Sequence, residues 1–272
     1  TKYIEEINRG NYKLNIEENT EDELSILKNE LYKITIKLKE VAENSQKDKT
    51  TLKDSLSDIS HQLKTPLSAL MMYQEIIENE PENFETVKEF SLKIGTALKR
   101  MEQLIQSMLK ITRIDAGSIS FEKSNYSIPN IINHAISELT TRADNEKKEI
   151  VIDGDLEQML YCDIEWTGEA IGNIIKNALD HTDTGGKISI SWEQTPAMIR
   201  IFITDNGHGI SQEDIHHIFK RFYRSKNTSE SQGIGLGLPL AKAIVEGQGG
   251  ILSVQSERLQ GTTFTLSFLT ES

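Results

Sequence analysis

His61 combines a side chain that can attack phosphorus with a position expected to face solvent. Four apolar residues around it share one helix face: Leu52, Leu56, Ile59 and Leu63. At about 100° per residue, His61 lies roughly 170° from their mean direction, so its imidazole should point outward. A neutral imidazole offers a nitrogen lone pair for in-line attack on a γ-phosphorus. Thr65 lies on nearly the same outward face, and Pro66 is expected to bend the helix. From this segment alone, an ordinary surface histidine is an equally good interpretation.

Two asparagines have a spacing that suits a magnesium ion. Asn173 and Asn177 fall within a helical stretch at 164–180, and a separation of four residues places both amides on one face. Amide oxygens are hard ligands for Mg²⁺, which usually keeps several waters and shares its coordination with phosphates. The simpler alternative is that both asparagines are capping or solvent-exposed groups.

An Asp-Asn-Gly-His-Gly segment at 205–209 follows an apolar strand. Gly207 and Gly209 permit a tight turn with a close backbone approach, and the Asp205 carboxylate can accept a hydrogen bond from an adenine amino group. A plain strand-to-helix turn explains the same residues equally well.

A second glycine-containing segment, with Gly233, Gly235, Leu236 and Gly237, precedes a predicted helix. The free backbone N–H groups at the start of that helix can hold phosphates. A glycine triplet discriminates poorly by itself, and this one lacks the strand–turn–helix context and trailing acidic residue of a dinucleotide-binding fold.

Two helices with heptad-like apolar spacing are expected to position His61. The first has apolar residues at Leu24, Leu27, Leu31, Ile34, Leu38 and Val41, then resumes at Leu52. The step from Val41 to Leu52 is close to three turns, so one long helix can run through despite Ser45 and Asp48. The second helix has Val87, Phe90, Ile94, Ala97, Met101, Leu104, Met108 and Ile111.

The segment 79–83, which contains Pro81, is expected to join these helices as an antiparallel hairpin. Two helices alone expose too much apolar surface, so the hairpin predicts a homodimer that forms a four-helix bundle. The alternative is a hairpin docked on its own C-terminal domain.

From about residue 119 the pattern becomes mixed α/β, and residues 115–118 are a candidate hinge. Strands are expected at 149–152, 187–192, 198–204, 251–255 and 262–268. Helices are expected at 129–142, 164–180, 211–219 and 238–246. This pattern predicts helices layered on one mostly antiparallel sheet.

Composition limits the remaining possibilities. The 272 residues include 42 acidic and 30 basic residues, for a formal charge of -12, which argues against a nucleic-acid partner. The single cysteine, Cys162, excludes a disulfide framework and fits a reducing, cytoplasmic setting. No window approaches the length of apolar sequence needed to span a membrane, so the chain is expected to be soluble as given.

The residues Ser-His-Gln-Leu-Lys-Thr-Pro-Leu at 60–67 resemble the phospho-acceptor box of the sensor histidine kinases. In order along the chain, the segments 173–177, 205–209, 219–222 and 233–237 resemble the N, G1, F and G2 boxes of the Bergerat-type ATP-binding domain. That domain is shared by histidine kinases, Hsp90-like chaperones and mismatch-repair ATPases. Only histidine kinases carry an exposed histidine on a dimeric hairpin upstream of it.

The resemblance implies a fold with an α part and an α/β part: a dimeric four-helix bundle followed by a two-layer α/β sandwich of Bergerat type. It implies three domains: a HAMP-like signal-transmitting segment at 1–50, a dimerisation and phosphotransfer hairpin at 51–116, and a catalytic ATP-binding domain at 117–272. The HAMP-like match is loose and rests on residues 7–10 and 21–24.

The resemblance also implies roles for individual residues. His61 would accept the phosphoryl group from ATP and pass it to an aspartate of a response regulator, and Thr65 would assist dephosphorylation of that regulator. Asn177 would bind Mg²⁺, with support from Asn173, and Asp205 would read adenine with Thr263 nearby. Residues 224–232 would form a mobile lid. The expected ATP contacts are Asn173, Asn177, His181, Asp205, Gly207, Gly209, Phe222, Arg224, Gly233, Gly235, Leu236, Gly237 and Thr263.

Three residues depart from the family pattern. Gln62 replaces the common acidic residue after the histidine, so the proton acceptor is open, with Asp58 and solvent as alternatives. Asp180 and His181 stand where a basic and an aromatic residue are frequent, although His181 can still stack on adenine. A signalling scaffold without kinase activity, a phosphatase-dominated receptor and a chaperone-type ATPase are the alternative functions. The chain is expected to be a cytoplasmic fragment whose longer parent is anchored in the cell membrane.

Overall fold

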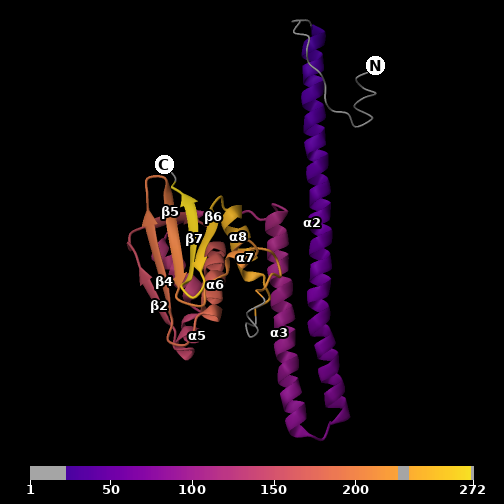
Figure 1. Cartoon of the computed structure of the whole chain (residues 1–272), viewed down its shortest axis with the longest axis vertical. Coiled ribbons are helices and arrows are strands. Elements are labelled where there is room, and N and C mark those ends of the chain that lie inside the picture. Colours follow the sequence, from indigo (N-terminus) through magenta and orange to yellow (C-terminus); the bar gives the residue numbers. More distant parts are fainter. Residues whose placement is uncertain (1–22, 226–232, 271–272) are drawn as a thin grey trace. The chain divides into compact units, whose positions relative to one another are not determined.

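The computed structural model describes residues 23–225 and 233–270, which belong to two units (Figure 1). The first unit is Thr1–Met72 and the second is Tyr73–Ser272. Two predicted features lie outside the described residues: the HAMP-like turn at 7–10 and residues 226–232 of the expected lid. In the first apolar seam, the side chains of residues 24–32, 35, 38 and 41–56 also lie outside the described part.

Helix α2 (Glu23–Asn79) is continuous over 57 residues (Figure 1). The polar interruption at Ser45 and Asp48 does not break it, which confirms the prediction of one long helix. Pro66 lies inside the helix rather than at its end. His61 and Thr65 are exposed on the first unit, as the spacing of the apolar residues predicts, and Gln62 is exposed as well.

Helix α3 (Phe84–Asp115) follows a short turn that is closed by side-chain capping. The Asn83 side chain accepts a hydrogen bond from the Thr86 N–H at 3.3 Å, which satisfies one free donor of the first helical turn. The rings of Tyr73, near the end of α2, and Phe90, near the start of α3, lie 5.5 Å apart. The turn at residues 80–83 therefore forms a helix hairpin, as predicted from Pro81.

The C-terminal half of α3 packs on the α/β part of the second unit. Leu104, Met108 and Ile111 are buried, and α3 contacts helix α8 (Gly237–Gly247). The Lys110 ammonium lies 2.5 Å from the Glu169 carboxylate, and Asp115 pairs with Arg221. The last apolar residues of the second predicted seam thus pack on the protein's own C-terminal domain.

The main sheet has five strands in the order β2-β4-β5-β7-β6. Their bounds are β2 (Glu149–Asp153), β4 (Lys187–Gln194), β5 (Met198–Asp205), β6 (Ile251–Glu257) and β7 (Gly261–Leu269). Strands β2 and β4 are parallel and the other neighbours are antiparallel, which confirms the mostly antiparallel prediction. Strands β1 (Ser124–Ser127) and β3 (Met159–Cys162) form a separate antiparallel pair that was not predicted, because four residues are too few to show periodicity.

Helices α6 (Ile164–His181) and α8 form the second layer, with α6 against β4 and β5 and α8 against β6 (Figure 1). Strict alternation along β5 directs Ile199, Ile201 and Ile203 into this interface, where they are buried. Helix α4 (Ile128–Ile136) packs on α6. The helix predicted at 129–142 is wrong as a single element, because turns after Ile136 separate α4 from α5 (Thr140–Asn145). Likewise, the helix predicted at 211–219 is only α7 (Gln212–Ile215), followed by tight turns.

Candidate active site

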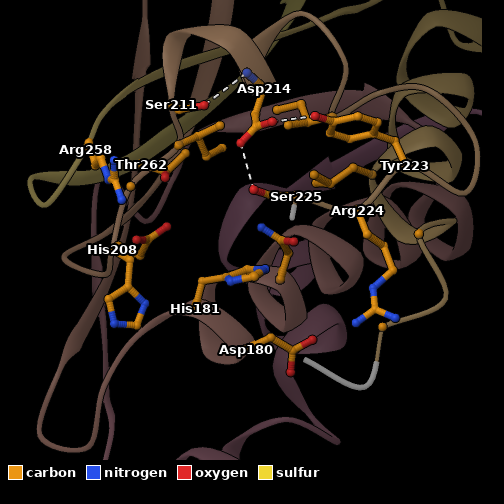
Figure 2. A pocket seen from close by; sticks show the side chains of 18 of the residues that line it. Asp180, His181, His208, Ser211, Asp214, Tyr223, Arg224, Ser225, Arg258 and Thr262 are labelled. Atoms are coloured by element: carbon orange, nitrogen blue, oxygen red, sulfur yellow. Dashed lines mark hydrogen bonds between the residues drawn. The ribbon is translucent and has the colours of Figure 1, made fainter. Parts of the chain in front are cut away.

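A pocket of about 370 Å³ lies among α6, the end of β5, α7 and the β6–β7 turn (Figure 2). It brings together residues from three of the four motif segments, at 173–177, 205–209 and 233–237, and from the expected lid at 224–232. The lining consists of Asn177, Asp180, His181, Asp205, His208, Gly209, Ile210, Ser211, Asp214, Ile218, Tyr223, Arg224, Ser225, Gly233, Gly235, Leu238, Arg258, Leu259 and Thr262.

Helix α6 positions the asparagines because its apolar face is buried in the core. Asp163 caps its start, and the buried stripe includes Ile171, Ile174 and Ile175, so neighbouring polar positions are directed to the rim. Asn177 lines the pocket. The Asn173 amide donates to the Glu169 carbonyl oxygen at 3.0 Å, and its Oδ1 would lie 3.2 Å from a Cβ added at Gly237. Asn173 therefore lies beside the start of α8.

Asp205 ends β5 at the buried end of the pocket. Its carboxylate accepts a hydrogen bond from the Gly207 N–H at 2.9 Å, and the Thr262 N–H also donates to it. Burial raises the pKa of Asp205 above its ordinary value of 3.8, and these two hydrogen bonds oppose the shift. The carboxylate is a strong acceptor in a mostly dry site, and it can take a hydrogen bond from a ligand amino group.

The structure corrects the assignment of Thr263. Thr262 is opposite Asp205 in the β5–β7 register and is buried, whereas the Thr263 hydroxyl lies 3.0 Å from the Thr204 hydroxyl. Successive residues of a strand point to opposite faces, so a shift of one position moves the side chain across the sheet. Thr262 is the pocket residue, and Thr263 faces the other side.

The glycines of the 205–209 segment allow backbone to pass close to neighbouring backbone. A Cβ on Gly207 would lie 2.1 Å from the His181 carbonyl oxygen, and Gly209 has φ 67°. Gly207 lies behind the pocket wall, while Gly209 is part of the lining. These contacts hold the turn after β5 against the end of α6, as its glycines led us to expect.

His181 and Asp180 lie at the end of α6 and line one side of the pocket (Figure 2). Burial lowers the pKa of His181 below its ordinary value of 6.5, with Asp180 acting in the opposite direction and His208 in the same one. His181 is therefore a neutral ring that can stack on a planar ligand. Asp180 places a carboxylate where the family pattern has a cation, and that carboxylate is paired with Arg142 at 2.6 Å.

Helix α8 begins at Gly237, so its first N–H groups start next to the glycine-containing segment. Gly235 has φ 75°, and its carbonyl oxygen accepts a hydrogen bond from the Phe222 N–H at 2.8 Å. Gly233 and Gly235 line the pocket, whereas Leu236 is buried beneath it. Phe222 and Gly237 support the wall without being among the lining residues.

Arg224 also lines the pocket, between Tyr223 and Ser225 in the chain (Figure 2). Both neighbours donate hydrogen bonds to Asp214, and those bonds hold the pKa of Asp214 below its ordinary value of 3.8. The sequence interpretation did not include Asp214 or Tyr223 in the site. The spacing Ser211-x-x-Asp214 is a capping signal that marks a helix start, but it does not reveal the later contact with Tyr223.

Several known proteins resemble this chain. Residues 51–117 match the family "His Kinase A (phospho-acceptor) domain", and residues 162–272 match "Histidine kinase-, DNA gyrase B-, and HSP90-like ATPase". SenX3 of Mycobacterium tuberculosis, a sensor-like histidine kinase, is 29% identical over 79% of this chain and 53% of its own length. The sensor protein SrrB of Staphylococcus aureus is 30% identical over 79% of this chain and 37% of its own length. The chain thus spans about half or less of these relatives.

Solved structures show the same fold. The histidine kinase AdeS of Acinetobacter baumannii superposes with a TM-score of 0.64 at 20% identity, over 78% of this chain and 98% of that one. The histidine kinase ThkA, solved in complex with the response regulator protein TrrA, gives a TM-score of 0.67 at 18% identity, over 83% and 64% of the two chains. At these identities the likeness concerns the fold alone.

The structure contains a helix hairpin with an exposed histidine on its first helix, followed by an α/β sandwich whose pocket has a buried carboxylate and a glycine-bordered helix start. The two family matches together cover more than half of the chain and fall on these two parts. The chain belongs to the sensor histidine kinases of two-component systems. Among the described helices, none is long and apolar enough to cross a membrane.

Proposed function

We propose that this chain is the autokinase part of its parent protein: it transfers the γ-phosphoryl group of ATP to His61 and then to an aspartate of a response regulator. The observation that carries the proposal is His61 itself, exposed on a continuous helix within the residues that match the phospho-acceptor family. Its side chain is a nitrogen nucleophile that solvent, and therefore a separate ATP-binding domain, can reach.

ATP would occupy the pocket with its adenine against Asp205 and His181. The Asp205 carboxylate accepts a hydrogen bond from the amino group, and the neutral His181 ring stacks on the base. The N–H groups at the start of α8 and around Gly235 hold the phosphates. Arg224, which lines the pocket, contacts the γ-phosphate with its guanidinium fork.

Mg²⁺ fits the donor set of the pocket because Asn177 supplies an amide oxygen at the wall, which suits a hard cation shared with phosphates. Asn177 would hold the ion, and Asn173 would support it from the preceding turn. When bound, the ion neutralises charge on the phosphates. Asp180, one turn beyond Asn177, adds negative charge on this side, and its pairing with Arg142 compensates for it.

In the transfer step, a ring nitrogen of His61 forms a bond to the γ-phosphorus while the bond to the bridging oxygen of ADP breaks. Gln62 orients the imidazole by hydrogen bonding but cannot accept its proton, which passes to Asp58 or to solvent. The rate then depends mainly on positioning and on neutralising charge. Rotation at residues 115–118 would bring the pocket and His61 together.

We propose that the receiving partner is a response-regulator receiver domain that docks on the hairpin. The solved complex of ThkA with the response regulator protein TrrA supports a partner of this kind. Thr65 would assist the reverse, phosphatase reaction. A homodimer would cover the exposed apolar residues of the helices, among them Leu67, Met71, Met72, Leu92, Leu98, Ile105 and Leu109. In the parent protein this part would face the cytoplasm below a membrane anchor.

Labelling with ATP that carries a radioactive γ-phosphate, in the presence of Mg²⁺, tests the proposal. The protein should take up acid-labile, base-stable label, and His61→Ala should abolish it while His216→Ala, at another exposed histidine, keeps it. Label that survives His61→Ala would refute the assignment. An absence of label would favour a scaffold or phosphatase, and steady phosphate release that survives His61→Ala would favour a chaperone-type ATPase.

A further inference from the structure

Arg224 lies between two residues that share one hydrogen-bond acceptor. The Tyr223 hydroxyl donates to Oδ1 of Asp214, and the Ser225 hydroxyl donates to Oδ2 of the same carboxylate at 2.7 Å (Figure 2). One carboxylate therefore engages both neighbours of the arginine, and each neighbour uses a different oxygen. A single flanking contact would leave the segment free to rotate, whereas two contacts to one rigid group fix its orientation.

The orientation that results directs Arg224 away from Asp214. Since Tyr223 and Ser225 both face the carboxylate, the side chain between them extends in another direction, which Figure 2 shows for Arg224. Hydroxyl donors from both neighbours of Arg224 engage the two oxygens of Asp214, so the carboxylate contacts the chain on both sides of the arginine.

Asp214 is itself held in place. It lies on α7, and its N–H donates to the Ser211 hydroxyl at 3.2 Å, which fixes the start of this helix. Hydrogen bonds from Tyr223 and Ser225 keep the pKa of Asp214 low, so the acceptor stays ionised at neutral pH. Hydrogen bonds to an ionised acceptor are stronger than neutral ones.

The other end of the same segment is fixed by Gly235. Phe222 has φ 62°, and its N–H donates to the Gly235 carbonyl oxygen at 2.8 Å. A Cβ on Gly235 would lie 2.9 Å from the Phe222 backbone, so the backbone segments around Phe222 and Gly235 are in close contact. Residues 222–225 are thus held at two places. Phe222 is bound to the loop that precedes α8, and the two neighbours of Arg224 are bound to Asp214 of α7.

We propose that Asp214 is a positioning residue that holds Arg224 in the orientation that contacts the γ-phosphate, and the inference rests on the proposed ATP-dependent function. Asp214 need not touch the nucleotide. Replacing Asp214 should therefore weaken binding of a nucleotide with a γ-phosphate more than binding of one without it. Loss of local folding alone would weaken both to a similar extent.

The test compares ATP and ADP binding to the whole chain by calorimetry, with Mg²⁺ present. Asp214→Ala should weaken ATP binding about tenfold, while ADP binding stays within about twofold. Glu213→Ala, at the adjacent exposed carboxylate of α7, is the matched control and should leave both affinities unchanged. Arg224→Ala should reproduce the selective loss, and the double variant should be no weaker than Arg224→Ala alone, because Asp214 acts through the arginine.

Asp214→Ala also removes a carboxylate from the first turn of α7, which could disturb that helix. A second variant therefore separates loss of the contacts to residues 223 and 225 from damage to α7. Tyr223→Phe combined with Ser225→Ala keeps α7 and its cap intact but removes both donors, and it should show the same ATP-selective loss. Equal losses for ATP and ADP, or additive losses in the double variant, would overturn the inference. The ratio of ATP affinity to ADP affinity can be measured without phosphoryl transfer. A failure of His61 labelling would therefore refute the proposed function but would leave this binding test unchanged.

Discussion

Arg142 donates a hydrogen bond to Oδ1 of Asp180 at 2.6 Å, although the two residues come from α5 and α6. Arg142 also contacts Glu146 at 2.6 Å, and Lys148 contacts both Glu146 and the Leu179 carbonyl oxygen. The network contains two cations and two anions. It therefore compensates for the carboxylate that Asp180 introduces into the wall of the pocket.

Arg142→Ala should weaken binding of MgATP. Without its partner, the Asp180 carboxylate remains beside the phosphates, where like charge repels them. We expect affinity to fall about three- to tenfold at low salt, which corresponds to one partly exposed charge interaction. Calorimetric titration at two salt concentrations measures the effect, and the loss should shrink at the higher concentration.

Asp180→Asn supplies the control for that prediction. It removes the carboxylate itself, so binding should be at least as strong as in the native chain, and Arg142→Ala should then have little further effect. If Arg142→Ala weakened binding equally in the Asp180→Asn background, the arginine would act on the nucleotide in some other way than by neutralising Asp180.

His181 should make the stability of the folded chain depend on pH. Its pKa is lowered by burial, so between the lowered value and 6.5 the unfolded chain binds a proton that the folded chain does not. More protons on the unfolded state mean that the free energy of unfolding falls as pH decreases through this window. His181→Asn should make the decrease shallower, as measured by urea unfolding at a series of pH values.

His216→Asn is the matched control for His181, because His216 is exposed at the end of α7. This variant should keep the native pH dependence. An unchanged slope in His181→Asn would show that the ring is not protected from protonation, and stacking of a neutral His181 on adenine would lose its support.

Gly209→Ala should destabilise the pocket strongly. The residue has φ 67°, and an added Cβ would lie 2.1 Å from the Glu257 carbonyl oxygen. We expect a loss of about 2 kcal/mol or more in the free energy of unfolding. Gly233→Ala is the comparison, because among the described residues no atom other than those of its chain neighbours lies within 4 Å of its added Cβ, and its effect should stay within about 0.5 kcal/mol. Thermal unfolding of both variants distinguishes a strained position from an open one.

Sequence periodicity predicted much of the fold because the long elements repeat. The two helices of the hairpin, the five strands of the main sheet and the order of the boxes were all readable from local patterns. Short elements were not, as the split between α4 and α5 and the pair β1–β3 illustrate, since four to nine residues contain too few repeats. The misassignment of Thr263 has a similar origin, because adjacent threonines in a strand differ only in which face they occupy.

The sequence by itself identified the residues that are expected to carry chemistry. The spacing of apolar residues predicted that His61 faces outward, and the ordered motifs assigned Asp205, Asn177 and the glycines to one predicted ATP-binding domain. Tertiary structure alone decided which side chains meet: Thr262 with Asp205, Arg142 with Asp180, and Tyr223 and Ser225 with Asp214. Local pattern reflects the geometry of one helix or strand, whereas these contacts depend on how separate elements pack, and packing brings together residues far apart in the chain.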